Sequence, residues 1–100
     1  MSTVSDSDEV LSRLFGSVSR ARILGFLLSQ SGKPSYQREI MYETGLSLQP
    51  TQRELKNLLD LGIIKKRETT EKVYYEIDTL SPFFNPLREI FGSVSKLRRK

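Results

Sequence analysis

Residues 45–67 constrain the fold more than any other stretch, with the sequence Gly-Leu-Ser-Leu-Gln-Pro-Thr-Gln-Arg-Glu-Leu-Lys-Asn-Leu-Leu-Asp-Leu-Gly-Ile-Ile-Lys-Lys-Arg. A short turn precedes a segment in which the residues expected to face inward recur with helical spacing. These residues are Thr51, Leu55, Leu58 and Leu59. Gly62 ends this helix, and a strand-like segment with three consecutive basic residues follows at once. The pattern predicts an amphipathic helix directly followed by a basic strand.

The start of this helix has two possible registers. Ser47 is a favourable N-cap residue, and it would place Pro50 in the first turn, where the missing N–H costs nothing. A residue before proline avoids helical geometry, so Gln49 is the alternative cap. The choice matters because it decides which polar side chains point outward.

Helical and strand-like patterns flank this segment on both sides. On the N-terminal side, the pattern predicts one helix from about Asp8 and a second from the Ser17 cap to about Gln30. A short strand is possible at Ser35 and Tyr36, and a short helix is expected over 37–43. The C-terminal side predicts strands over 63–67 and 72–78, a hairpin tip over 68–71, and a helix from Phe83. The expected order is α-α-α-α-β-β-α, a mainly α protein with a small β-hairpin in the α+β class.

One hundred residues suit a single domain. We expect a disordered start over 1–8, because small polar and acidic residues leave little to bury, then a domain over 9–95 and a basic tail over 96–100. The polar start is no signal peptide, and the longest apolar run, near 23–28, is too short to cross a bilayer. These features predict a cytoplasmic protein with no membrane partner.

The chain contains neither cysteine nor histidine. This excludes disulfides, thiol nucleophiles, imidazole acid–base catalysis and zinc sites built on those ligands. The sequence also offers no glycine-rich phosphate loop and no plausible carboxylate pair, so we expect no enzyme, no cofactor and no metal. A net charge of +4 is compatible with a nucleic-acid partner without proving one.

Four stretches, in order and at these separations, match one known pattern: Ser-Arg-Ala-Arg-Ile-Leu at 19–24, Arg-Glu-Ile at 38–40 with Thr-Gly-Leu-Ser at 44–47, the segment 53–64, and Val-Tyr-Tyr-Glu-Ile at 73–77. Over residues 14–87 the chain resembles the winged-helix transcription regulators of the ArsR type, in their short prokaryotic form. The resemblance implies a helix-turn-helix with a β-wing, and binding of double-stranded DNA. Metal-sensing members bind metal through cysteine, often with histidine, so metal sensing is not expected. Pro50, and a hairpin tip without Gly or Asn, also depart from the pattern.

The helix after Ser47 carries candidate base-reading residues on the face opposite Leu55 and Leu58, namely Gln49, Gln52, Arg53 and Lys56. Glutamine can pair with adenine and arginine with guanine in the major groove, each good pair giving about 1–3 kcal/mol of discrimination. A solvated helix face is the plainer interpretation. The turn before the helix and the basic strand after it favour DNA reading.

The hairpin predicts contacts to phosphate, which orient a protein on DNA and supply much of the affinity. The candidates are Lys65, Arg67, Thr69, Thr70 and Lys72, with Arg38 at the start of the short helix. Because side chains alternate along a strand, Lys65 and Arg67 share one face while Lys66 points the other way. Tyr36 is expected to be a packed residue rather than a contact. The plainer interpretation is a charged edge strand protected against aggregation, and Glu68 and Glu71 would repel phosphate.

The terminal helices carry more apolar residues than so small a core needs, namely Leu11, Leu14, Phe15, Phe83, Leu87, Ile90, Phe91 and Val94. Packing of the first helix on the last within one chain is one interpretation. We favour a two-fold homodimer, which would place two reading helices about one DNA turn apart, roughly 34–36 Å. The function expected is a DNA-binding transcriptional regulator, nucleoid-associated when bound to DNA. The alternative is a winged-helix module for protein–protein contact in a transcription or replication assembly.

Overall fold

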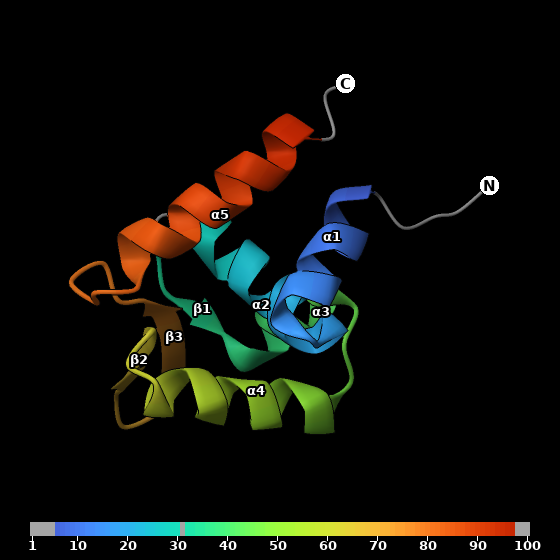
Figure 1. The fold of residues 1–100 in the computed structure, drawn as a ribbon. Coiled ribbons are helices and arrows are strands. Elements are labelled where there is room, and N and C mark those ends of the chain that lie inside the picture. The colour runs from blue at the N-terminus through green and yellow to red at the C-terminus, as the bar shows by residue number, and fades with distance from the viewer. Residues whose placement is uncertain (1–5, 31, 98–100) are drawn as a thin grey trace.

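A computed structural model describes residues 6–30 and 32–97 of the chain. Within these residues the chain forms five helices and a three-stranded antiparallel sheet (Figure 1). In chain order the elements are α1 (Asp6–Phe15), α2 (Val18–Ser29), β1 (Ser35–Tyr36), α3 (Gln37–Thr44), α4 (Leu48–Asp60), β2 (Ile64–Glu68), β3 (Val73–Ile77) and α5 (Phe84–Leu97). The α+β class predicted from the sequence is confirmed.

The predicted element order is wrong at one point, because it lacks β1. This short strand lies between α2 and α3 and pairs with β3, so that β3 becomes the central strand in the order β1-β3-β2. A two-residue strand has no periodicity of its own, and β1 forms because β3 offers it an edge. The expected disordered start (1–8) and basic tail (96–100) also overlap α1 and α5, while residues 1–5 and 98–100 lie outside the described residues.

The helix boundaries follow local capping chemistry. The side chain of Ser17, the predicted cap of α2, accepts a hydrogen bond from the backbone N–H of Arg20 at 3.1 Å. Ser47 is the N-cap of α4 in extended geometry, which places Pro50 in the first helical turn and rejects the alternative register with Gln49 as the cap. Gly45 ends α3 in the left-handed conformation that glycine adopts without strain, with φ at 74°.

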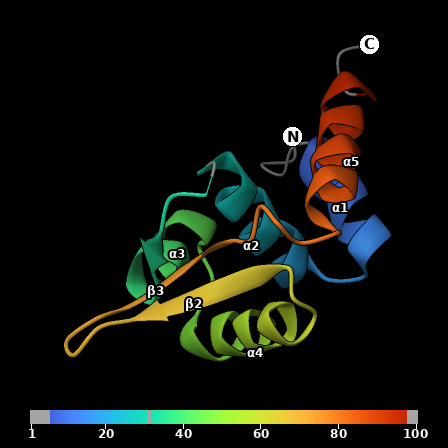
Figure 2. The same ribbon diagram turned by 90° about the vertical axis from the view of Figure 1, so that its left-hand side faces the viewer.

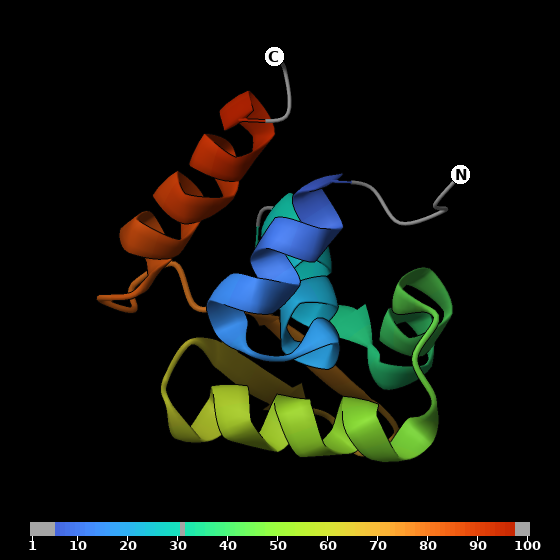
Figure 3. The same ribbon diagram turned by 45° about the vertical axis from the view of Figure 1, so that its right-hand side comes forward.

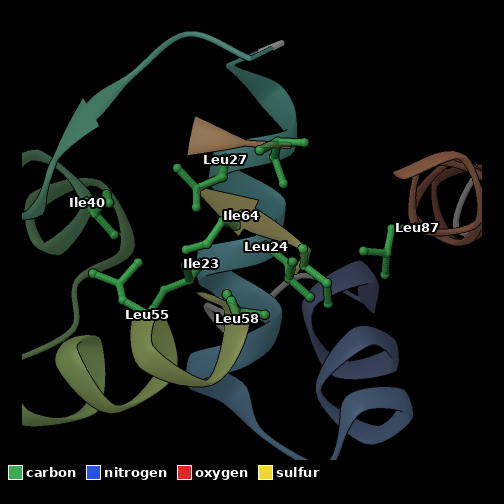
Figure 4. Packing of buried hydrophobic residues seen from close by; sticks show 10 residues of the cluster. Ile23, Leu24, Leu27, Ile40, Leu55, Leu58, Ile64 and Leu87 are labelled. Atoms are coloured by element: carbon green, nitrogen blue, oxygen red, sulfur yellow. The ribbon is translucent and has the colours of Figure 1, made fainter. Parts of the chain in front are cut away.

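The core is built around α2, which runs through the middle of the molecule (Figure 4). Ile23, Leu24 and Leu27 of α2 are fully buried against side chains from α3, α4, the sheet and α5. The surrounding buried residues include Ile40, Leu55, Leu58, Ile64, Ile77 and Leu87. The inward positions predicted for α4 at Thr51, Leu55 and Leu58 are confirmed, and Leu59 is half-buried. This packing fixes α4 by its inner side only.

The helices α1 and α5 pack on each other at the other end of the molecule. The ring of Phe15 stacks on that of Phe91 with centroids 5.8 Å apart, and Leu11 and Val94 are buried beside them. Figures 1 and 3 show α4 along the opposite edge, away from the start of α1 and the end of α5. The described ends of the chain therefore leave the outer side of α4 open.

Candidate nucleic-acid interface

The polar side of α4 faces solvent. The predicted base-reading residues are all exposed, namely Gln49, Gln52, Arg53 and Lys56. None of the described elements lies beyond α4 on this side of the molecule (Figures 1 and 3). The ammonium of Lys56 is 3.1 Å from the carboxylate of Asp60, an exposed pair one turn further along the same helix. The outer side of α4 is thus a continuous polar surface whose length is set by the helix.

A buried carboxylate that the sequence reading missed lies on the inner side of α4. Glu54 is 3 % exposed and accepts hydrogen bonds from Arg20 Nε at 2.9 Å and Nη2 at 3.3 Å. A third guanidinium nitrogen of Arg20 donates to the backbone oxygen of Phe15 at 3.4 Å, at the end of α1. The two-point contact joins the buried side of α4 to α2, and so supports the orientation that the buried stripe of α4 sets.

A sequence signal for Glu54 was present. The residue falls three positions after Thr51 and four before Leu58, so it lies on the stripe that the periodicity predicts to be buried. A carboxylate on a buried stripe requires a partner, because an unpaired buried charge is strongly unfavourable. The partner itself lies 34 residues away along the chain, which no local pattern reveals.

The basic hairpin contains a second buried carboxylate. Glu76 of β3 is 3 % exposed, and it accepts from Arg67 Nη2 at 2.8 Å and lies 4.0 Å from Lys65 Nζ. The register explains this, because Lys65 is directly opposite Glu76 on the neighbouring strand. Two of the predicted phosphate-binding cations therefore share one negative charge, which lowers the positive potential that they offer to a phosphate.

Lys66 lies on the other face of the sheet, as the alternation predicts. It lines a groove of about 300 Å³ between α4 and the sheet, together with Gln37, Gln52, Leu55, Lys56, Leu59, Asp60 and Tyr75. The groove brings the predicted base-reading residues Gln52 and Lys56 next to Lys66, a hairpin cation that is not among the predicted phosphate contacts. Gln49 and Arg53 are exposed on α4 but do not belong to this lining.

The hairpin tip is closed by a side chain rather than by a glycine. The hydroxyl of Thr69 accepts from the backbone N–H of Lys72 at 3.0 Å and from that of Glu71 at 3.3 Å. The hydroxyl predicted to bind phosphate therefore organises the turn, whereas Thr70 is exposed at the tip. Figure 2 shows the hairpin extending past the helices, so its tip projects beyond the compact part of the molecule.

Tyr36, which the sequence predicts to be packed, lies beside the hairpin and is half-buried. Its ring stacks on that of Tyr74 at 4.7 Å between centroids, and the two hydroxyl oxygens are 3.2 Å apart. The Lys72 ammonium lies 5.5 Å from the centre of the Tyr36 ring. This cluster depends on β1, because the pairing of β1 with β3 places Tyr36 opposite Tyr74.

The charges around this cluster shift the pKa values of its members. Hydrogen bonding to Lys72 and to Tyr74 lowers the pKa of Tyr36 below its usual value, and the nearby charges of Lys72 and Arg38 act in the same direction. The hydrogen bond to Tyr36 raises the pKa of Lys72, and also that of Tyr74. Arg38, a predicted phosphate contact, is exposed at the start of α3.

The residues predicted to form a dimer interface divide into two groups. Leu11, Leu87 and Val94 are buried within the chain, and Phe15 and Phe91 are half-buried against each other. The other members of the set are exposed, namely Leu14 at 61 %, Phe83 at 45 % and Ile90 at 37 %. Packing of the first helix on the last within one chain therefore accounts for the first group but leaves the second without cover from the described chain.

Comparisons with protein-family models, with curated proteins and with solved structures give no match. The resemblance to ArsR-type regulators stays a prediction from the sequence, and function rests on the geometry of this chain. Among residues 6–30 and 32–97, none of the helices combines the length and apolar content that a membrane span requires. The same residues contain no group of three or more carboxylates able to bind a metal ion.

Proposed function

We propose that the chain is a sequence-specific double-stranded DNA-binding transcriptional regulator of the winged helix-turn-helix type. In this proposal α3, the turn around Gly45 and α4 form the helix-turn-helix, and the β2–β3 hairpin is the wing. The observation that carries the proposal is the exposed polar side of α4, fixed from behind by the core and by Arg20, and bordered by a basic hairpin. A B-DNA major groove is about 12 Å wide and admits one α-helix.

The division of labour follows from the placement of each side chain. Gln49, Gln52 and Arg53 are exposed over the N-terminal half of α4, and side chains at this end of a reading helix contact base edges. Among the described residues, Lys66 and Lys72 of the hairpin form no ion pair or hydrogen bond with a carboxylate, unlike Lys65 and Arg67. In this proposal Lys66 and Lys72 are therefore the hairpin cations most available to phosphate. Base readout is thus assigned to α4 and phosphate contact mainly to the hairpin.

We also propose that the regulator is a homodimer joined through α1 and α5. A lone helix-turn-helix reads few base pairs, and a two-fold pair reads two half-sites about one helical turn apart. The partner surface contains the exposed apolar residues Leu14 of α1 and Ile90 of α5, with Phe83 directly before α5, and these two helices are packed together by Phe15 and Phe91. Helix α5 lies on the side of the molecule away from the N-terminal half of α4 (Figure 1).

Selection of bound duplexes from a random pool tests the proposal, with the oligomeric state measured alongside by sedimentation. We expect a palindrome whose half-sites are about one turn apart, bound with a strong salt dependence. Failure of the wild-type chain to bind any duplex, even at low salt, would overturn the proposal.

A specific observation favours one other candidate, a winged helix that contacts an acidic protein. Tyr42 is 84 % exposed and Leu48 is 48 % exposed near the start of α4, and Glu76 neutralises part of the wing. Aromatic and apolar side chains of this kind are common in protein interfaces. The same salt-titrated measurement separates the two candidates, because this one predicts no affinity for random duplex at low salt.

Arg53→Ala is expected to weaken binding to the selected site by about 1–3 kcal/mol while leaving random duplex almost unaffected, since it removes a base contact. Lys66→Ala is expected to weaken binding to every duplex and to lower the slope of log affinity against log salt by about 0.9, since it removes a phosphate contact. Fluorescence anisotropy over a salt series measures both quantities. Lys33→Ala is the charge-matched control, and equal loss of specificity in Arg53→Ala and Lys66→Ala would refute this assignment.

A further inference from the structure

We propose that Tyr36, Tyr74 and Lys72 form a binding site for one phosphodiester of duplex DNA at the border of the wing and α3. The inference rests on the proposed function and adds to it a contact that is built from the sheet rather than from the hairpin tip. It joins Tyr36, which the sequence predicted to be packed, and Tyr74 to the predicted phosphate contact Lys72, and it makes a tyrosine hydroxyl part of the DNA interface.

The site is rigid because its tyrosines belong to paired strands. Tyr36 and Tyr74 are opposite each other in the β1–β3 pairing, and their rings stack at 4.7 Å. Lys72 directly precedes β3, and its backbone is fixed by the hydrogen bond of its N–H to Thr69 at 3.0 Å. The two tyrosine rings therefore keep their relative positions before any ligand arrives, which reduces the entropy lost on binding.

The hydrogen-bonding capacity of the pair is incomplete. Two hydroxyl groups carry two protons, and the single contact of 3.2 Å between their oxygens uses one of them. The hydroxyl that accepts the hydrogen bond in this pair still has its own proton, which it can donate to an acceptor outside the pair. The Lys72 ammonium beside the Tyr36 ring adds a positive charge and further donors. A group with several acceptor oxygens and a negative charge satisfies both needs, which is the chemistry of a phosphodiester.

The surroundings favour a phosphate of the duplex over a free acidic ligand. The cluster shares its face of the sheet with two hairpin cations, because Arg67 is directly opposite Tyr74 and Lys65 alternates with Arg67 along β2. Arg38 adds positive charge, which acts on Tyr36 in the same direction as Lys72. The acidic group Glu39 already accepts the backbone N–H of Tyr36 at 3.3 Å. A phosphate backbone lying along this face of the hairpin would meet these cations together.

The charge state of Tyr36 gives the site a pH dependence. Lys72, Tyr74 and Arg38 lower the pKa of Tyr36 in the free protein, whereas Glu39 is the acidic group in contact with its backbone. A bound phosphate favours the protonated phenol and therefore raises the pKa of Tyr36 in the complex. Protons are then bound more tightly in the complex than in the free protein, so affinity falls as pH rises through the free-state pKa.

Conservative variants test the site. Tyr36→Phe keeps the ring and removes the hydroxyl, and it is expected to weaken binding to both selected and random duplex by about tenfold. Lys72→Gln is expected to lower the salt slope by about 0.9, whereas Lys33→Gln, with the same change of charge, should leave it unchanged. Between about pH 7 and pH 10 the wild-type affinity should fall earlier than that of Tyr36→Phe, which lacks the phenol whose pKa is lowered. Far-UV circular dichroism and thermal unfolding verify that each variant is folded.

A duplex with one neutral methylphosphonate, moved position by position, locates the contact. At one position in each half-site the wild type should lose affinity while Tyr36→Phe loses nothing further, because the two changes remove the same interaction. If Tyr36→Phe and Lys72→Gln bind like the wild type while Lys66→Ala is weakened, the site is refuted and the proposed function stands. If the wild type binds no duplex at all, both fail together.

Discussion

Ile90→Glu is expected to convert the proposed dimer into a folded monomer and to weaken binding to a palindromic site by about 10²–10⁴-fold. The loss is large because binding of two linked half-sites benefits from a high effective concentration, which a monomer lacks. Ile90 is 37 % exposed within one chain, so its replacement should lower the folding stability by about 1–2 kcal/mol, which leaves the monomer folded. Sedimentation velocity measures the association state, and anisotropy on one and two half-sites measures the binding.

The control and the choice of residue both follow from the packing of α5. Asn85→Glu adds the same charge at an exposed polar position of the same helix and should leave the dimer intact. Phe91 is unsuitable for this test because its ring stacks on Phe15 and also packs closely against Gly25. A Cβ atom placed on Gly25 would be 3.3 Å from the Phe91 ring. Replacement of Phe91 would disturb the fold as well as any interface. A wild-type chain that sediments as a monomer at working concentration would contradict the dimer.

Glu54→Ala is expected to lower the free energy of unfolding by about 3 kcal/mol, a large share of the stability of a domain this size. The change leaves the Arg20 guanidinium without the partner that it contacts through two nitrogens, at 2.9 Å and 3.3 Å. The effect lies at the lower end of the usual range for a broken buried pair because the Arg20 side chain is 33 % exposed. Urea denaturation followed by circular dichroism measures it.

A double variant distinguishes the loss of a partner from the loss of packing. Arg20→Met combined with Glu54→Leu removes both charges at similar volume and should recover most of the lost stability. If Glu54→Ala unfolds within about 0.5 kcal/mol of the wild type, the pair does not fix this helix.

The local features of the fold were predictable because they are written in short windows of sequence. The side chain of Ser17 caps α2, and Ser47 occupies the N-cap position of α4 without a side-chain hydrogen bond. The inward residues of α4 follow the helical period. The exposed polar face of α4 follows from the same period, since residues that are not on the buried stripe must face outward. Each of these inferences needs only residues within about one or two helical turns of each other.

The features that give the interface its chemistry come from contacts between distant residues. Tyr36 and Tyr74 are 38 residues apart, and their pairing requires β1, a strand that the sequence only left possible and whose partner no local pattern indicates. The pairing of Arg67 with Glu76 was concealed for a different reason. Alternation places both on one face, but burial of the carboxylate is decided by the sheet and its surroundings rather than by the hairpin alone.

The sequence by itself determined the apolar stripe of α4, which of its sides is polar, and that a basic hairpin follows. The choice between Ser47 and Gln49 at the start of α4 came from the structure. The tertiary structure alone decided which cations are free, which carboxylates they neutralise, and that Leu14 and Ile90 stay exposed while Leu11 and Val94 are covered. The reason is physical. Helical and strand periodicity is a property of neighbouring residues, whereas charge pairing and burial depend on which distant elements meet, and apolar periodicity is the same whether a helix packs on its own chain or on a partner.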